Sequence, residues 1–137
     1  MELHRTDHQD VSATLHLTLT EQEATALGAD AGHTLTALAQ ALWATADLRT
    51  GQPRDAWWPV VLECSRLMRQ LEGVRDAALR EMPQASHAEV AHAVGMPRST
   101  VSSRRQAGTL PPADPTQWET WARTGTYPQD AWARTES

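Results

Sequence analysis

The sequence has no Lys, Ile, Phe or Asn, and it contains a single cysteine, Cys64. One cysteine excludes a disulfide within the chain and a zinc site built from several cysteines. No apolar run approaches the roughly 20 residues that a membrane-spanning helix needs. The polar start, residues 1–10, lacks the apolar region of a secretion signal. We therefore expect a cytoplasmic protein without a membrane partner.

The missing residue types share a codon property. Lys, Ile, Phe and Asn are encoded by AT-rich codons, so their absence is typical of a GC-rich bacterial genome such as that of an actinobacterium. All twelve basic residues are consequently Arg. This bias explains part of the alanine content, and it carries no information about activity.

The charge is acidic overall but unevenly distributed along the chain. Residues 1–82 carry seven Arg and twelve acids, and residues 111–137 carry two Arg and four acids. Residues 83–110 carry three Arg and one acid, so this segment alone has a net positive charge. Because the distribution of charge matters more than its sum, a net charge of −5 does not exclude nucleic acid as a partner.

The N-terminal part of the chain gives two clear signals. We expect residues 1–10 to form a disordered tail. Residues 11–19 alternate apolar and polar side chains, a pattern that predicts a half-buried strand. Thr20 followed by Glu23 is a capping-box pattern, which predicts a helix that ends near Gly28.

Two longer amphipathic helices are expected next. The first runs from Thr34 to about Arg49, and the second begins after Asp55 as its N-cap. Gly73 is expected to break or bend this second helix before a further helical stretch, residues 74–82. The apolar stripes of these helices are Leu35, Leu38, Leu42 and Ala46 on the first helix and Trp57, Val61, Cys64, Met68 and Leu71 on the second.

Residues 86–106, SHAEVAHAVGMPRSTVSSRRQ, contain the most specific motif. Ser86 with Glu89 forms a second capping-box pattern, which starts a short helix. Gly95 ends this helix because glycine readily takes a positive φ, and Pro97 suits the first turn of the next helix. The residues expected to pack the two helices together are Val90, Ala91, Val94, Gly95, Met96 and Val101.

The run AEVAHAVGMPRSTVSSRR resembles the helix-turn-helix of bacterial DNA-binding proteins, in the form found in repressors, partition proteins and small actinobacterial regulators. The preceding stretch, LEGVRDAALREM, is similar to the first helix of such a trihelical unit. Many members of this superfamily carry a second apolar residue near the end of the recognition helix, where this chain has Arg104 and Arg105. Either Leu110 supplies the missing packing or the helix ends early.

The resemblance implies that residues 97–106 form a recognition helix in the major groove of double-stranded DNA. Ser and Thr are mediocre helix formers, but their hydroxyl groups suit contacts with bases and phosphates. Arg98 is the best candidate for a bidentate contact with guanine. The implied base contacts are Arg98, Ser99, Ser102, Ser103 and Gln106. The implied phosphate contacts are Ser86, Arg104 and Arg105.

The predicted fold is mainly α: a helical body with a short N-terminal strand, followed by a trihelical helix-turn-helix DNA-binding unit. The body spans residues 11–72, with a dimer contact expected through residues 34–71. The DNA-binding unit spans residues 73–110, and residues 111–137 form a Pro- and Trp-containing C-terminal tail, in which Thr116 could cap a short helix. The tail tryptophans, expected to anchor it to the body or alternatively to contact a protein partner, are Trp118, Trp121 and Trp132.

The function favoured by these patterns is a homodimeric, sequence-specific transcription regulator acting on DNA in the cytoplasm, at the nucleoid. One alternative is a protein–protein interaction module with an acidic helical body, in which the motif serves only packing. Another is a DNA-reading ribbon formed by residues 13–19, which the acidic neighbours Glu21 and Glu23 disfavour.

Enzyme chemistry has little support in the sequence. The chain shows no phosphate-binding loop, no nucleophile with a paired base and no clear cluster of metal ligands. His4, Asp7 and His8 could hold a metal only if they lay on one helical face, and they fall in the expected tail. We therefore predict no enzyme activity, no cofactor and no metal site.

Overall fold

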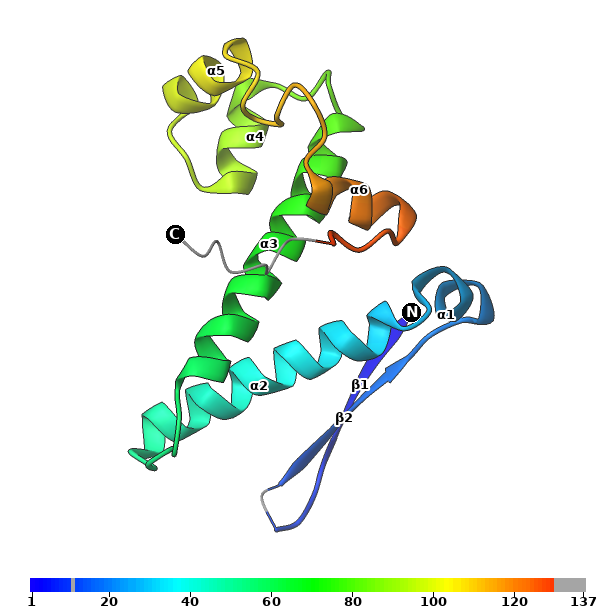
Figure 1. Ribbon diagram of the computed structural model, residues 1–137, viewed down its shortest axis with the longest axis vertical. Coiled ribbons are helices and arrows are strands. Elements are labelled where there is room, and N and C mark those ends of the chain that lie inside the picture. Colours follow the sequence, from blue (N-terminus) through cyan, green and yellow to red (C-terminus); the bar gives the residue numbers. More distant parts are fainter. Residues whose placement is uncertain (11, 130–137) are drawn as a thin grey trace.

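The computed structural model describes residues 1–10 and 12–129 (Figure 1). Within these residues the protein is mainly helical, as predicted, with a two-stranded sheet at the N-terminus. The strands are β1 (Glu2–Asp7) and β2 (Ala13–Thr18). The helices are α1 (Glu21–Leu27), α2 (Asp30–Thr50), α3 (Trp58–Arg80), α4 (His87–Val94), α5 (Arg98–Gln106) and α6 (Gln117–Thr124).

The two strands form an antiparallel hairpin in which Leu3 lies opposite Leu17. Every residue of both strands is exposed. The N-terminal ammonium of Met1 lies 2.9 Å from the Glu23 carboxylate, so the start of the hairpin is held against α1. A lone two-stranded hairpin is only marginally stable, which makes such an attachment important.

The hairpin corrects two predictions. The expected disordered tail over residues 1–10 is wrong for Glu2–Asp7, because these residues pair with β2. The strand predicted from the alternating pattern is confirmed over Ala13–Thr18, but its expected half-burial is wrong because Leu15 remains 61% exposed. Val11 lies outside the described residues.

Local capping signals place the first helix correctly. The Thr20 hydroxyl accepts a hydrogen bond from the Glu23 amide, and the Glu23 carboxylate accepts one from the Thr20 amide, which completes the predicted capping box. The helix then stops at Gly28, as predicted. The next helix begins at Asp30, before the predicted start at Thr34, because the chain turns directly from α1 into α2.

Small side chains form the buried side of α2. Ala37 and Ala44 are buried where α2 packs against α3, and small residues let two helix backbones approach closely. The predicted stripe lies on the opposite side of α2, because residues near 35, 38 and 42 are about half a turn from residues 37 and 44. The predicted apolar stripe is therefore on the outside of the body: Leu35, Leu38 and Leu42 are exposed.

Helix α3 is continuous from Trp58 to Arg80. It therefore starts later than the predicted N-cap Asp55, and Gly73 does not break it. A Cβ atom at Gly73 would lie 2.4 Å from the backbone oxygen of Trp118, so glycine is needed here for the close approach of α6. The predicted apolar stripe of α3 is also largely on the outside, with Val61, Met68 and Leu71 each more than half exposed.

Helix α6 packs along α3, so residues 117–124 are not a free tail. Its predicted cap is confirmed, since the Thr116 hydroxyl accepts a hydrogen bond from the Glu119 amide. Trp121 is buried and Trp118 is half-buried, which confirms the predicted anchor to the body. Trp132 lies outside the described residues.

A buried ion pair fixes α6 on α3. The Glu119 carboxylate has no exposed area and accepts hydrogen bonds from Arg80 at 2.7 and 2.9 Å. Arg123 contributes a third contact at 3.3 Å. The hydrogen bonds from Arg80 hold the pKa of Glu119 below its ordinary value, although burial acts to raise it. The carboxylate is therefore charged and paired inside the fold.

The elements spread out from two long helices (Figure 1). Helices α2 and α3 diverge from the loop that joins them, α4 and α5 lie beside the C-terminal end of α3, and the hairpin lies on the far side of α2. None of the helices in residues 1–10 and 12–129 has both the length and the apolar character required to cross a membrane.

The contact at Gly73 yields a stability prediction. We expect Gly73→Ala to lower the free energy of unfolding by about 1–3 kcal/mol, because the new methyl group overlaps the α6 backbone. Gly32→Ala on α2 is the matched control, since no atom lies within 4 Å of a Cβ there. It should be neutral or stabilising by about 0.5–1 kcal/mol. Urea unfolding measures both, and equal stabilities for the two variants would contradict the close packing of α6.

Candidate nucleic-acid interface

The first helix of the candidate interface begins as its sequence predicts. The Ser86 hydroxyl accepts a hydrogen bond from the Glu89 amide at 3.1 Å, and the Glu89 carboxylate accepts one from the Ser86 amide at 2.8 Å. The backbone donor at Ser86 stabilises the ionised carboxylate and lowers the pKa of Glu89. This reciprocal pair fixes the first turn of α4.

The turn between α4 and α5 depends on Gly95. This residue adopts the left-handed conformation, with φ 69° and ψ 33°, and its amide donates to the Ala91 carbonyl at 3.0 Å. Met96 donates to the same carbonyl, so both hydrogen bonds close the last turn of α4. Pro97 is the N-cap residue of α5, immediately before the first helical turn in which it was expected. The predicted glycine turn is confirmed.

A small apolar cluster holds α4 and α5 together. Its centre is Val101, which has no exposed area. The cluster confirms most of the predicted packing set and adds Leu110, so of the two alternatives for the missing apolar position of α5 the structure shows packing by Leu110. The buried members are Leu79, Val90, Ala91, Val101 and Leu110, and the partly buried hydrophobic residues packed against them are Ala85, Val94 and Met96.

The side of α5 away from Val101 is polar. Successive helical residues turn by about 100°, so the five residues expected to contact bases fall within an arc of about 140°. Four of them are exposed and Ser102 is half-buried. The five residues are Arg98, Ser99, Ser102, Ser103 and Gln106. The fold therefore presents the expected base-contacting residues together on one surface.

The three Arg residues of this segment have different environments. Arg98 and Arg104 are exposed, and their guanidinium groups make no hydrogen bond or ion pair with any residue that the structure describes. Arg105 is half-buried and donates to the Ala85 carbonyl at 2.6 Å, with His87 Nδ1 at 3.2 Å. Arg105 thus links α5 to the segment that precedes α4. Ser86, the other expected phosphate contact, is exposed at the N-terminus of α4.

The α4–α5 region is connected to the helical body through few residues. Within the described part of the chain, Leu79 is the one buried residue that α3 contributes to the cluster. The predicted domain boundary at residue 73 falls inside the continuous helix α3. A second connection runs through Arg80, which donates to the carbonyls of Pro112 and Ala113 just after the cluster residue Leu110.

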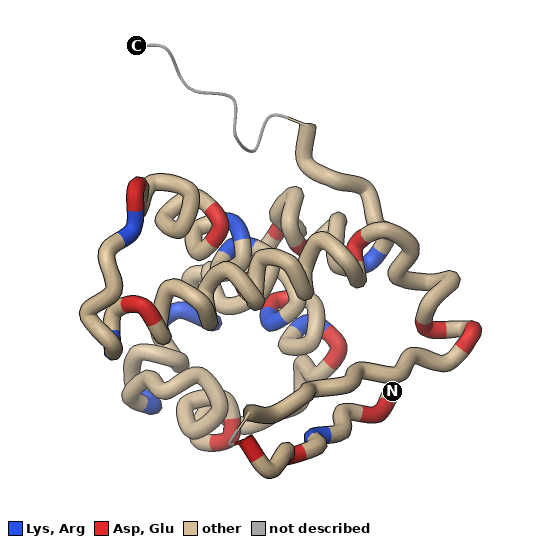
Figure 2. Tube along the Cα trace, turned by 90° about the horizontal axis from the view of Figure 1, so that it is seen from below, with Lys and Arg blue, Asp and Glu red and all other residues tan. Residues whose placement is uncertain are grey.

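Outside the α4–α5 region, acidic and basic residues lie among one another. Figure 2 shows acidic and basic positions interspersed over the helices, while acidic positions outnumber basic ones along the N-terminal hairpin. The hairpin is therefore a poor surface for a polyanion. In the part of the chain that the structure describes, no three His, Cys, Asp or Glu side chains gather in a way that could hold a metal ion.

Comparisons with known proteins do not assign this site. No protein-family model, no curated protein and no solved structure matches the chain. The geometry of the site itself is therefore the basis for assigning its function.

Sequence reasoning missed the residues that attach α6. Arg80 and Glu119 lie 39 residues apart, and nothing in the local pattern pairs them. The available signal was the Thr116 cap followed by Trp118 and Trp121, which marks a short helix with an apolar side. Such a helix needs a partner, but its sequence does not specify which helix that partner is.

The geometry of the turn predicts a specific response to mutation. The Cβ position of Gly95 has no neighbour within 4 Å, so a side chain there meets backbone strain rather than a clash. We expect Gly95→Val to lower the free energy of unfolding by at least about 1–2 kcal/mol, the cost of the left-handed conformation for an ordinary residue. Gly95→Asn should cost less because Asn tolerates this conformation. Thermal melting compares the variants, and an unchanged melting temperature for Gly95→Val would place the turn elsewhere.

Proposed function

We propose that this protein is a sequence-specific DNA-binding transcription regulator, in which α4 and α5 form a helix-turn-helix and α5 enters the major groove. The observation that carries this proposal is that the two sides of α5 differ. Val101 is fully buried on one side, while the residues on the opposite side are polar and exposed. In this proposal the C-terminal part of α3 completes a trihelical unit through Leu79. The protein would act at the nucleoid.

The composition of α5 supports this function over a purely structural one. Neighbouring Ser residues lower helix propensity, and a helix selected only for stability would carry Ala or Glu on its exposed side. Ser, Gln and Arg instead supply donors and acceptors that suit base edges in the major groove. The cost in helix stability is offset by the Val101 cluster, which fixes α5 through its other side.

The environments of the Arg residues refine their proposed roles. Arg98 lies in the first turn of α5, on the polar side, and is assigned a bidentate contact with guanine. The Arg104 guanidinium, near the end of α5, makes no hydrogen bond or ion pair with another described residue and is assigned a contact with a phosphate. The exposed Ser86 is also assigned a phosphate contact. Arg105 was expected to bind phosphate as well, but its bond to the Ala85 carbonyl favours a role in orienting α5.

The assignment of Arg98 and Arg104 gives a test of the proposed function. Arg98→Ala should cost about 1–3 kcal/mol of binding free energy on the preferred sequence and relax selectivity at one base pair. Arg104→Ala should weaken binding to all sequences alike and reduce the dependence of affinity on salt. Fluorescence anisotropy with a selected duplex and a scrambled duplex separates these effects. Equal losses on both duplexes for Arg98→Ala would show that Arg98 does not read a base.

We also propose that the regulator is a homodimer, with the contact within residues 34–71. Helix α2 exposes Leu38, Leu42 and Trp43, and α3 exposes Met68 and Leu71, although monomeric proteins rarely expose large apolar patches. The alternative function, a protein–protein interaction module, draws on the same exposed residues. A second copy of the chain is the favoured partner for this surface, because one motif has few free cations. Pairing two motifs on a two-fold DNA site enlarges the contact with DNA.

The dimer is tested by one substitution on the exposed stripe and one beside it. Leu38→Glu should convert a dimer into a monomer and weaken DNA binding, because the charge would be buried in the interface. Leu48→Glu is the matched control, since Leu48 is 68% exposed on the same helix but lies off the stripe. Sedimentation at micromolar concentration measures the mass of each.

On DNA, the dimer should protect two half-sites about one helical turn apart. A wild-type chain that is monomeric both free and on DNA, and that protects a single half-site, would rule the dimer out.

A further inference from the structure

The N-terminal hairpin has a leucine face that no helix covers. Leu3 lies opposite Leu17, and Leu15 is two residues before Leu17 on the same strand, so the three side chains share one face. All three are exposed, and neither strand packs against a helix in the described part of the chain. Arg5 and Asp7 form an ion pair on the same face, nearer the turn. The opposite face is polar and consists of Glu2, His4, Thr6, Thr14, His16 and Thr18.

A hairpin of this kind needs a covering element. An isolated two-stranded hairpin is at best marginally stable in water, and it becomes stable when its apolar face packs on a helix or on further strands. The base of this hairpin is fixed to α1 through both strands. Strand β2 ends at Thr18 and α1 begins at Glu21, while the Met1 ammonium before β1 pairs with Glu23. The hairpin is therefore not free to fold down onto α2 of its own chain.

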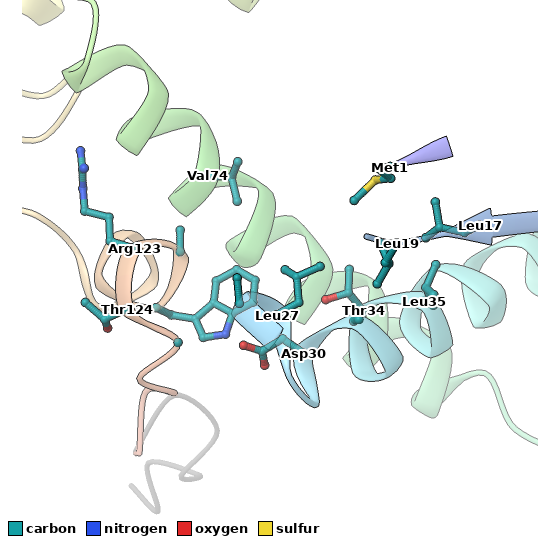
Figure 3. Close-up of a pocket in the computed structure, with 15 residues that line it drawn as sticks. Met1, Leu17, Leu19, Leu27, Asp30, Thr34, Leu35, Val74, Arg123 and Thr124 are labelled. Atoms are coloured by element: carbon teal, nitrogen blue, oxygen red, sulfur yellow. The ribbon is translucent and has the colours of Figure 1, made fainter. Parts of the chain in front are cut away.

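The exposed stripe of α2 begins beside the base of the hairpin. Leu17 and Leu35 line the same cavity, which has a volume of about 460 Å³, and Figure 3 shows both residues at one end of it. Leu38 and Leu42 continue the stripe from Leu35 along α2, and all three are exposed. The hairpin and α2 thus present two leucine surfaces that meet at the base of the hairpin.

Two-fold symmetry brings the hairpin of one chain to α2 of another. The hairpin, α1 and α6 lie around the N-terminal end of α2 (Figure 1), so an antiparallel pairing of two α2 helices keeps these elements apart. Contacts across a two-fold axis are reciprocal. If the stripes pair about Leu38, Leu42 of one chain lies beside Leu35 of the other. Leu42 then also lies next to the hairpin whose base adjoins that Leu35.

The size of the contact favours including the hairpin. A stable interface buries roughly 800 Å² on each partner. The stripe of α2 supplies three exposed leucines, Leu35, Leu38 and Leu42, and the hairpin face supplies three more. A contact through α2 alone would leave half of these leucines in water on both copies.

We propose that the N-terminal hairpin is a dimer clamp, which packs its leucine face on α2 of a second copy of this chain. Leu15 and Leu17 of one copy contact Leu42 of the other, and the polar face of the hairpin stays in water. Each copy supplies one hairpin and receives one, so the clamp occurs twice in the dimer. This inference rests on the homodimer proposed above and extends its contact surface to residues 2–18.

Two neighbouring substitutions on opposite faces of the hairpin test the clamp. Leu15→Glu should raise the dissociation constant of the dimer about a hundredfold, because each of the two clamps loses a buried leucine. His16→Glu is the matched control, since His16 is exposed on the polar face. It should change the dissociation constant by no more than about threefold, as surface substitutions usually do. Sedimentation equilibrium of the full chain measures both constants.

Disulfide trapping identifies the helix that the hairpin contacts. In a Cys64→Ser background, chains with Leu15→Cys and chains with Leu42→Cys are mixed and oxidised with glutathione disulfide. The mixture should give a cross-linked dimer that neither variant gives alone. Replacing Leu15→Cys by His16→Cys is the control and should abolish the cross-link. This measurement keeps the test decisive if Leu15→Glu unfolds the hairpin.

The possible outcomes separate the clamp from the dimer itself. A dimer with equal dissociation constants in Leu15→Glu and His16→Glu, or a mixture without the cross-link, would overturn the clamp and leave the proposed homodimer standing. A monomeric wild-type chain would overturn both. In a chain that carries both cysteines, an internal disulfide without a cross-linked dimer would show that the hairpin covers its own α2 and would also overturn the clamp.

Discussion

The ion pair between Arg80 and Glu119 is the interaction on which the arrangement of the molecule depends. Arg80 is the last residue of α3, and its guanidinium binds both the carboxylate inside α6 and the backbone carbonyls of Pro112 and Ala113. Glu119 is fully buried, so loss of Arg80 would leave an inadequately compensated charge in a dry environment. The Arg80 side chain thus holds both the segment that connects α5 to α6 and the contact between α6 and α3.

This constraint also determines where the proposed recognition helix sits. The α4–α5 cluster takes one buried residue from α3, Leu79, directly before Arg80. The cluster is therefore attached to the body at adjacent positions of one helix, by an apolar contact and by a network of charged hydrogen bonds. An attachment at adjacent positions of one helix suits a dimeric regulator, because the contact between the two bodies would then set the spacing of the two recognition helices.

Local structure was largely predictable from the sequence. The capping boxes at Thr20 and Ser86, the glycine turn at Gly95 and the buried position of Val101 are each encoded within a few residues, and all are found in the structure. The capping boxes and the glycine turn depend on neighbours along the chain, whereas the burial of Val101 also requires Leu79 of α3 and Leu110. The polar face of α5 follows from the same local periodicity.

Long-range packing was not predictable in the same way. The leucine stripe of α2 has the periodicity of a core face, but α2 packs through Ala37 and Ala44, and periodicity cannot tell a protein core from a surface left for a partner. Residues 2–7 are polar apart from Leu3, so no alternating pattern marks their strand, which is defined mainly by pairing with β2. The partner of Glu119 depends on tertiary structure alone.

The main proposal is that α5 reads a DNA sequence. It is tested most directly by selecting duplexes from a random pool with the purified full chain at low and at moderate salt. We expect enrichment of one two-fold symmetric sequence at both salt concentrations, with lower affinity at the higher salt. Recovery of no common sequence at either salt concentration would contradict it.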